Sequence, residues 1–471
     1  MPVLTPAAVA VAVAGRAAAN LSRLVRRALA RRALPRDESC WIEVRLRAHL
    51  HEERTPRAPF VSEPHLTFLE ILQVIESAGS DPRVDGVLLK LEGGPVSFGR
   101  ALSLRRAILA LRERGKPVVA YAESVDAPAF LVASAATRFW LPEEGSLFLV
   151  GIRFEATYLR GLLDRLHVEP EVIRVGSHKA MAERFTRERM SDEEREQLEG
   201  LADDVYEALV AGIAAGRGLE EGAVRAAIDA GPYRGRTAVE AGLADACLYP
   251  DELDQRLAEL APLPTAVQVS DPRRVHRTAA PTYCALGIDS GWRPLLRDLP
   301  RIAYVVAGGI IHRSRRNAGI ACDELRDTLD ELRTNEAVRA VVLRIESPGG
   351  DSLASDLLWR SISLVAREKP IVVSMGDVVA SGGYYMAVAA HALLAEAATV
   401  TGSIGVVGGK ANLAELYRRI GLGRDAVERG ARAGMLSESR GFSEDERRAL
   451  QAELSWVYDA FTDRVAQGRG L

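Results

Sequence analysis

Short apolar runs alternate with amphipathic stretches along most of this chain, and the same order occurs twice. In the first half, the periodicity predicts a strand, helix, strand, helix and strand at residues 41–46, 67–77, 84–91, 102–114 and 118–121. The second half predicts the same succession at 302–306, 324–333, 341–345, 353–367 and 371–375. Strands that alternate with helices predict crossover connections and a mainly parallel sheet. The expected fold class is therefore α/β, built as a tandem duplication of one unit.

Matching segments support this duplication. The first copy reads DPRVDGVLLKLEGG, GKPVVAYAESVDAPAF and VIRVGSHKA, and the second reads NEAVRAVVLRIESPGG, EKPIVVSMGDVVASGGYY and VERGARAGM. In the last pair of segments, Lys179 falls opposite Ala433. In the middle pair, Ser381 falls opposite Pro128. Since each copy retains one of the two reactive residues, we expect the serine and the lysine to form a single hydrolytic site between them.

The domain organisation follows from these patterns. We expect a basic Ala/Arg-rich segment, a first copy that supplies the lysine, a proline-rich linker and a second copy that supplies the serine, at residues 1–39, 40–255, 256–300 and 301–471. After IAAGRGL the first copy continues through GPYRGRTAVEAGLAD, whereas the second copy ends at the similar VAQGRGL. The second copy is therefore expected to lack its closing segment.

Composition narrows the class of protein. The chain has 471 residues, of which 48% are hydrophobic and 27% charged, as in soluble globular proteins of two or three domains. A net charge of −3 argues against bulk nucleic-acid binding. The sequence shows no His/Cys cluster with zinc-ligand spacing. We expect neither a metal nor another cofactor. The four cysteines are scattered and predict no disulfide framework.

The first 36 residues form a distinct basic region that contains no acidic residue. The apolar run Val3–Gly15 is shorter than the roughly 20 residues that span a bilayer, and arginines follow it instead of preceding it, unlike a cleavable signal peptide. Leu21, Leu24, Val25 and Leu29 have helical spacing, with arginines at most other positions. We expect an amphipathic helix that contacts an anionic membrane surface through residues 16–34. A free basic tail, or a helix packed on its own protein, is the alternative. The expected location is membrane-associated or cytoplasmic.

Ser381 is the candidate nucleophile because it lies between a predicted strand and a helix expected to begin near Gly382. Free N–H groups at a helix start stabilise a developing anion. The glycine turn SPGG, which ends at Gly350, follows the neighbouring strand, and the carboxyl edge of a parallel sheet is where ligands bind. An isolated SGG would be explained as a plain turn, but two glycine motifs on consecutive strand ends favour a site. The N–H groups of Gly350 and Gly382 are candidate oxyanion donors.

A serine hydroxyl needs a base before it can attack a carbonyl group. His391 follows Ser381 by about ten residues, at the far end of the predicted helix, where packing or capping explains it better. Lys179 follows an apolar run, and burial can lower the pKa of a lysine until it is neutral near pH 7. Any single lysine is most often a solvated surface charge, and only the alignment of the copies singles this one out.

The motifs SPGG, ASGGYYMA and TGSIGVVG, together with RVGSHKAMAERFTRERMS, resemble the signal peptide peptidase A (protease IV) family in its long, two-copy form, over roughly residues 40–471. The resemblance implies a Clp-protease/crotonase fold in each copy. It also implies a homotetrameric serine endopeptidase that degrades released signal peptides and other apolar, unfolded peptides. The family commonly has an N-terminal membrane span, which this sequence does not show.

The resemblance also assigns roles by position. Ser381 corresponds to the nucleophile, Lys179 to the general base, and Ser403 in TGSIG to the serine that orients the lysine. Gly350 and Gly382 correspond to the oxyanion donors.

Two other functions stay open at this point. A crotonase-type CoA-thioester enzyme would use carboxylates at the glycine turns, and Glu346 and Asp351 flank one of them. A non-catalytic, ring-forming scaffold is the other. It is disfavoured because the serine and the lysine survive in complementary copies.

Overall fold

The chain folds into two compact units. The computed structural model describes residues 6–34, 39–47, 50–53, 66–93, 96–260, 275–286, 295, 299–313 and 318–471. Unit 1 comprises Met1–Gly151, Val205–Arg301 and Glu396–Ala398, and unit 2 comprises Ile152–Asp204, Ile302–Ala395 and Thr399–Leu471. Residues 152–204, which the sequence places in the first copy, therefore pack with elements of the second copy. The copy boundaries themselves stay predictions about the sequence repeat.

Unit 1 is built on a six-stranded sheet in which every neighbouring pair is parallel. In spatial order its strands are β10 (Val275–Ala279), β1 (Ser39–Leu46), β2 (Gly86–Leu91), β3 (Val118–Ala122), β5 (Arg138–Leu141) and β9 (Ala246–Cys247). The strands β1 to β3 are buried except at Arg45 and Lys90, as expected for a parallel sheet covered on both faces.

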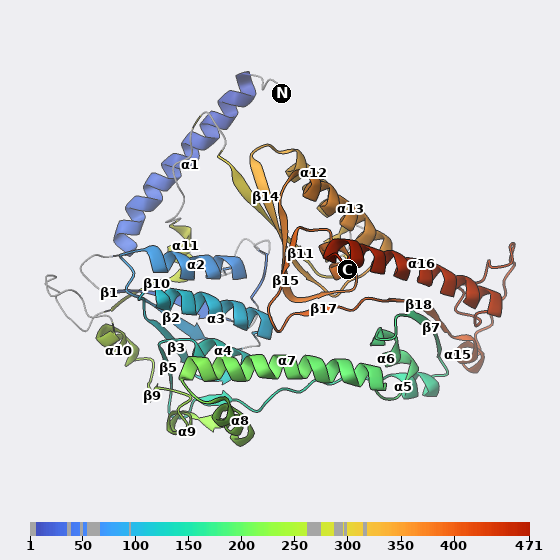
Figure 1. Ribbon diagram of the computed structural model, residues 1–471, viewed down its shortest axis with the longest axis horizontal. Helices are drawn as coiled ribbons and strands as arrows, with labels where there is room; N and C mark the ends of the chain where they lie inside the picture. The colour runs from blue at the N-terminus through green and yellow to red at the C-terminus, as the bar shows by residue number, and fades with distance from the viewer. Residues whose placement is uncertain are drawn as a thin grey trace. The chain divides into compact units, whose positions relative to one another are not determined.

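Helices α2 (Phe68–Ser80) and α3 (Phe98–Glu113) lie side by side in unit 1 (Figure 1). A capping box starts α2, in which Thr67 and Glu70 exchange side chain–backbone hydrogen bonds. The other elements of this unit are α1 (Pro6–Ala33), β4 (Ser124–Asp126), α4 (Ala127–Ser134), β6 (Ser146–Phe148), α8 (Glu221–Ala230), β8 (Tyr233–Arg234), α9 (Gly235–Glu240), α10 (Leu253–Leu260) and α11 (Ala280–Ala285). The stretch predicted as a linker, 256–300, thus contains the end of α10, β10 and α11.

Unit 2 contains a second sheet, whose strands in order are β11 (Arg301–Gly308), β14 (Val338–Ser347), β15 (Ile371–Ala380) and β16 (Ala392–Leu394), with β17 (Val400–Gly402) also paired to β15. The pairs that β15 makes with β14, β16 and β17 are all parallel. Helices α12 (Cys322–Thr334) and α13 (Ser352–Glu368) lie beside these strands (Figure 1). Their apolar faces are buried in the same core as the strands. A short parallel pair, β12 (Ile311–His312) and β13 (Ile320–Ala321), completes this part.

An antiparallel pair attaches residues 152–204 to the rest of unit 2. Strand β7 (Glu169–Val175) pairs along its whole length with β18 (Val406–Asn412). Helix α16 (Glu444–Arg469) packs on this pair through Leu450 and Leu454. The remaining elements are α5 (Arg160–Arg165), a 3-10 turn (Ala180–Ala182), α6 (Glu183–Thr186), α14 (Gly382–Ala387), α15 (Ala414–Arg419) and α7 (Asp192–Arg217), which runs from unit 2 into unit 1.

The predicted α/β class with parallel sheets is confirmed, and the predicted strands and helices are all present. The strand predicted at 371–375 is twice as long, because β15 continues through an irregularity to Ala380. Within the described part of the chain, no helix has the length and apolarity needed to cross a membrane.

Candidate active site

Ser381 occupies a strained turn between β15 and α14. Its backbone has φ +52° and ψ −122°, a conformation that non-glycine residues rarely adopt and that costs energy to maintain. A strand-to-helix turn of this kind presents a serine hydroxyl at the end of a sheet. The SPGG turn packs directly on it, since a Cβ on Gly349 would lie 2.7 Å from Ser381 Cβ and 2.8 Å from Gly382 N.

Two backbone amides lie beside this turn. Ile311 N–H donates to Gly349 O and Asp351 N–H donates to Ile311 O, both at 2.9 Å, and this parallel bridge leaves the Gly350 N–H on the opposite side of its strand. Gly382 is the first residue of α14, so its N–H has no acceptor within the helix. A Cβ on Gly382 would lie 3.3 Å from Gly350 N, so the two amides are close neighbours. Two such donors can hold an oxyanion.

Lys179 is buried, with only 5% of its surface exposed. Its Nζ donates hydrogen bonds to Ser403 O at 2.7 Å and to Ser403 Oγ at 3.0 Å. Burial lowers the pKa of the Lys179 ammonium from 10.5 to about 8. The aliphatic part of the side chain lies against Gly405, where a Cβ would be 2.9 Å from Lys179 Cβ. Gly405 therefore provides the space that the lysine occupies, a role that sequence reasoning missed although the residue belongs to the TGSIG motif.

Two strand pairings bring the lysine and the two serines together within unit 2. The pairing of Val175 with Val406 places the residues after β7 beside those before β18, so Lys179 meets Ser403. Gly402 is paired with Ala380, and Gly402 O accepts a hydrogen bond from Ser381 N at 2.8 Å. Ser403 therefore directly follows the residue bonded to Ser381. Among the described residues, the hydrogen bonds of Lys179 Nζ go to Ser403 and not to Ser381 Oγ.

Helix α16 contacts both halves of this arrangement. On the α14 side, the Phe461 and Tyr385 rings have centroids 4.8 Å apart, and Tyr385 Oη donates to Asp356 at 2.8 Å. On the lysine side, a Cβ on Gly176 would lie 3.5 Å from the Tyr458 ring. The sequence predicts neither contact, because each joins segments that are far apart in the chain.

His391 lies too far from Ser381 to act as its base. Its Nδ1 accepts a hydrogen bond from Ile371 N at 3.2 Å, at the first residue of β15. Ser381 follows the last residue of this ten-residue strand, so the two residues lie at opposite ends of β15. The structure thus gives His391 the packing role that the sequence favoured.

The carboxylates that a crotonase-type enzyme would use both accept hydrogen bonds from backbone amides. Glu346 accepts hydrogen bonds from Asp377 N at 2.7 Å and Val378 N at 3.2 Å. Asp351 caps α13 by accepting from Ala354 N at 2.8 Å, and its other oxygen is 3.3 Å from Arg313. These bonds account for both acids without acid–base chemistry on a thioester.

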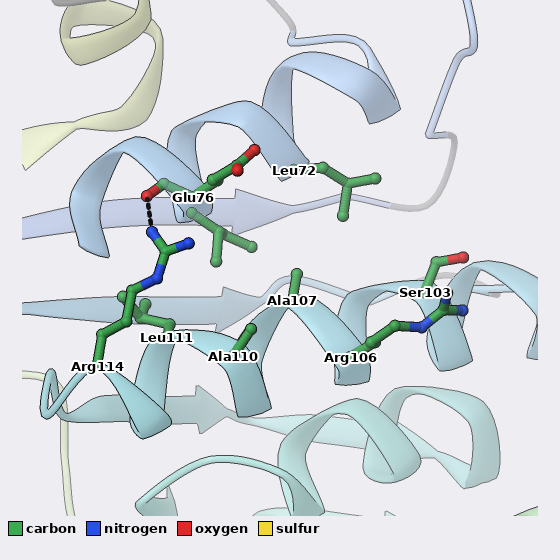
Figure 2. Close-up of a pocket in the computed structure, with 9 residues that line it drawn as sticks. Leu72, Glu76, Ser103, Arg106, Ala107, Ala110, Leu111 and Arg114 are labelled. Atoms are coloured by element: carbon green, nitrogen blue, oxygen red, sulfur yellow. Dashed lines mark hydrogen bonds between the residues drawn. The ribbon is translucent and has the colours of Figure 1, made fainter. Parts of the chain in front are cut away.

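A groove of about 330 Å³ lies elsewhere, between α2 and α3 of unit 1 (Figure 2). Its surface combines apolar side chains such as Leu72 and Leu111 with the arginines Arg106 and Arg114. Arg114 Nη1 donates to Glu76 O at 3.3 Å. The groove contains none of the residues predicted for catalysis.

Comparison with known proteins places the chain among peptidases. The sequence profile described as Peptidase family S49 matches residues 110–263 and 363–471, more than half of the chain. The chain is 32% identical over 412 residues to "Serine protease SPPA, chloroplastic" of Arabidopsis thaliana, which covers 86% of this chain and 60% of that protein. It is 27% identical over 412 residues to "Protease 4" of Salmonella typhi, and the alignment covers 86% of this chain and 65% of that protein. The chain thus spans less than two thirds of the length of these two curated relatives.

Solved structures show weaker likenesses. A 1510-N membrane-bound stomatin-specific protease is 12% identical, covers 52% of this chain and 97% of its own, and has a TM-score of 0.31. An enoyl-CoA hydratase from Shewanella pealeana is 12% identical and has a TM-score of 0.25. The match covers 41% of this chain and 62% of the hydratase chain. These scores are too low to carry an argument about function.

Replacement of Lys179 by methionine is expected to stabilise the protein at neutral pH. Because burial lowers the lysine pKa, the unfolded chain binds more protons than the folded chain between about pH 8 and 10.5, and stability rises with pH in this window. Below pH 8 the folded chain bears the full cost of burying a charged lysine, which amounts to at most about 3 kcal/mol of the free energy of unfolding. Urea unfolding of Lys179→Met should therefore show a gain at pH 7 that disappears near pH 10.5. An equal gain at both pH values would contradict the lowered pKa.

Proposed function

Because the chain belongs to peptidase family S49, we propose that it is a serine peptidase in which Ser381 is the nucleophile and Lys179 the general base. One observation carries this proposal. The buried Lys179 Nζ is hydrogen-bonded to Ser403, and the residue before Ser403 is bonded to the backbone of Ser381. Burial lowers the pKa of Lys179 to about 8, so a substantial fraction of the amine is neutral in mildly alkaline solution.

The proposed reaction proceeds by acyl transfer. Neutral Lys179 takes the hydroxyl proton of Ser381 as Oγ bonds to the carbonyl carbon of the substrate, and the N–H groups of Gly350 and Gly382 hold the oxyanion. The C–N bond then breaks, and the lysine ammonium gives its proton to the leaving amine. Water, deprotonated in turn by Lys179, hydrolyses the acyl-enzyme. Ser403 orients the amine throughout through its two hydrogen bonds.

The proposed substrates are released signal peptides and other apolar, unfolded peptides, with apolar side chains just before the scissile bond. A peptide in extended form can pair with backbone at a sheet edge. Two apolar residues next to the Gly350 turn support this preference, since Ile310 is 60% exposed and Leu353 is 50% exposed.

Peptide hydrolysis should rise with pH along a single ionisation with its midpoint near 8, because only the neutral lysine accepts the proton. Ser381→Ala and Lys179→Ala should each lower kcat/KM by about 1,000-fold or more, and Ser403→Ala should lower kcat by about ten-fold. A pH–rate profile with an apolar fluorogenic peptide tests this, with Lys116→Ala as the control lysine variant. A rate that is flat from about pH 6 to 10, or a profile unchanged by the loss of Lys179, would exclude lysine as the base.

A serine-reactive phosphonate separates the peptidase from the two alternative functions. A peptidase is labelled at Ser381, and Ser381→Ala is not labelled. A CoA-thioester enzyme or a ring-forming scaffold has no activated serine and remains unlabelled.

The proposed assembly is a homotetramer, and the repeat suggests how protomers would join. Alignment of GSLFLVG with GSIGVVG makes residues 149–155 the first copy's counterpart of β18. Alignment of Gly176 with Gly430 makes residues 423–429 the second copy's counterpart of β7. Both stretches lie within the described residues, and neither forms a strand. Val150 is 58% exposed and Val427 is 87% exposed. The pairing that β7 makes with β18 inside one chain can therefore recur head-to-tail between chains, and head-to-tail contacts form a ring when the rotation between protomers closes.

Val427→Pro is expected to shift the assembly toward monomers, because proline removes a backbone N–H and prevents strand pairing. Light scattering at micromolar concentration measures the change. Val427→Ile, which keeps the strand preference, should leave the assembly intact. A tetramer that persists in the proline variant would show that residues 423–429 lie outside the interface.

The proposed membrane contact involves α1. Leu21, Leu24, Val25 and Leu29 on this helix are 51–63% exposed, whereas Asn20 is 2% exposed. The helix therefore turns its apolar side outward, and the chain has no acidic residue before Asp37 to oppose an anionic lipid surface.

Co-sedimentation with vesicles tests this contact. Binding to vesicles rich in phosphatidylglycerol should exceed binding to phosphatidylcholine vesicles by about ten-fold or more, since several arginines contribute. Leu24→Asp should weaken this binding strongly, whereas Tyr249→Asp, at an exposed position outside α1, should not. Equal loss in both variants, or binding that is indifferent to lipid charge, would contradict the role of α1.

A further inference from the structure

The strand that leads to Ser381, β15, contains a bulge shortly before the serine. Ile345 of β14 is paired with Met375 of β15, and Ser347 is paired with Val379. Between these pairs β14 advances by two residues while β15 advances by four. Bulges of this kind redirect a strand and the side chains that follow it.

A carboxylate from the neighbouring strand holds the bulge. Glu346 lies between the two pairs on β14, and its Oε2 accepts from Asp377 N at 2.7 Å while its Oε1 accepts from Val378 N at 3.2 Å. It thereby replaces the carbonyl acceptors that a regular ladder would provide to these two amides. Gly376 is required for this fit, because a Cβ there would lie 1.9 Å from Glu346 Oε2. Thr399 Oγ1 also donates to Gly376 O at 2.9 Å.

The bulge is the point at which β15 changes neighbours. Before it, residues Val372 to Ser374 are paired with β16, and after it, residues Val378 to Ala380 are paired with β17. The second pairing places the end of β15 beside Gly402, and Ser403 with its bound Lys179 follows immediately. The direction that the strand takes at the bulge therefore determines where Ser381 lies relative to the lysine.

We infer that Glu346 is a positioning residue of the active site, whose carboxylate holds the bulge of β15 and so aligns Ser381 with Ser403 and Lys179. The inference rests on the proposed function, since it concerns the alignment of the proposed nucleophile and base. Glu346 itself exchanges no proton with the substrate and acts only through the backbone of β15. Both carboxylate oxygens are needed, because a glutamine would offer one acceptor and would turn its NH₂ group toward the second N–H.

The test is a double-mutant cycle in the full chain, read as the rate at which a phosphonate probe labels Ser381. Glu346→Gln should slow labelling by about 100-fold, as expected when a reacting group is displaced by about 1 Å. In a Lys179→Ala background the same substitution should change the rate by less than about two-fold, since no base remains to be aligned. With peptide substrate, Glu346→Gln should lower kcat and leave KM nearly unchanged.

A milder variant keeps the test valid if Glu346→Gln fails to fold. Thr399→Val removes the hydrogen bond to Gly376 O and should slow labelling by about ten-fold, again only when Lys179 is present. Thr328→Val is the matched control, because Thr328 makes a similar bond to Glu324 O on the exposed face of helix α12. It should leave the rate unchanged.

Two results would overturn the inference while leaving the proposed function intact. One is wild-type labelling and kcat in Glu346→Gln. The other is an equal loss of rate with and without Lys179, which would indicate general destabilisation and not alignment. Failure of the proposed function has a different signature, in which Ser381 is not labelled at all or Lys179→Ala alone leaves the rate unchanged, and the inference then fails with it.

Discussion

The antiparallel pairing of β7 with β18 is the interaction on which the candidate site depends. It joins residues from the first part of the chain to a strand more than 200 positions later, along the full length of both strands. Without this pairing, the loop that carries Lys179 would not be held beside Ser403. With it, the side chain is enclosed between Gly405 and Ser403, and its pKa falls because water is excluded.

The site combines several features that are unfavourable on their own. Burial lowers the pKa of Lys179, and no carboxylate among the described residues offsets this effect. Ser381 has a positive φ. Such features persist only where the surrounding structure determines the conformation strongly. Here the support comes from three sides, namely the SPGG turn, the bulge held by Glu346, and helix α16, which packs on both α14 and the β7–β18 pair. Contacts from these three elements thus offset the free-energy cost of the strained backbone at Ser381 and of the buried amine of Lys179.

Much of the fold could be predicted from the sequence because its signals are local. Strand and helix periods follow from the spacing of apolar residues, and glycine turns such as SPGG are visible in the chain itself. The end of β15 could not be predicted. Gly376 and Asp377 read as the end of a strand, yet the strand continues, because a side chain from β14 satisfies two amides that the bulge would otherwise leave unpaired.

The sequence alone determined the duplication, the parallel α/β class and the choice of Ser381 and Lys179 as candidates, because each follows from periodicity, from alignment of the copies or from motif resemblance. Only the tertiary structure decided which unit contains residues 152–204, which strand end lies beside which, and that Lys179 is buried against Ser403. The physical reason is that strand pairing and burial depend on contacts between distant segments. No local pattern of side chains specifies which of several apolar strands will be the partner.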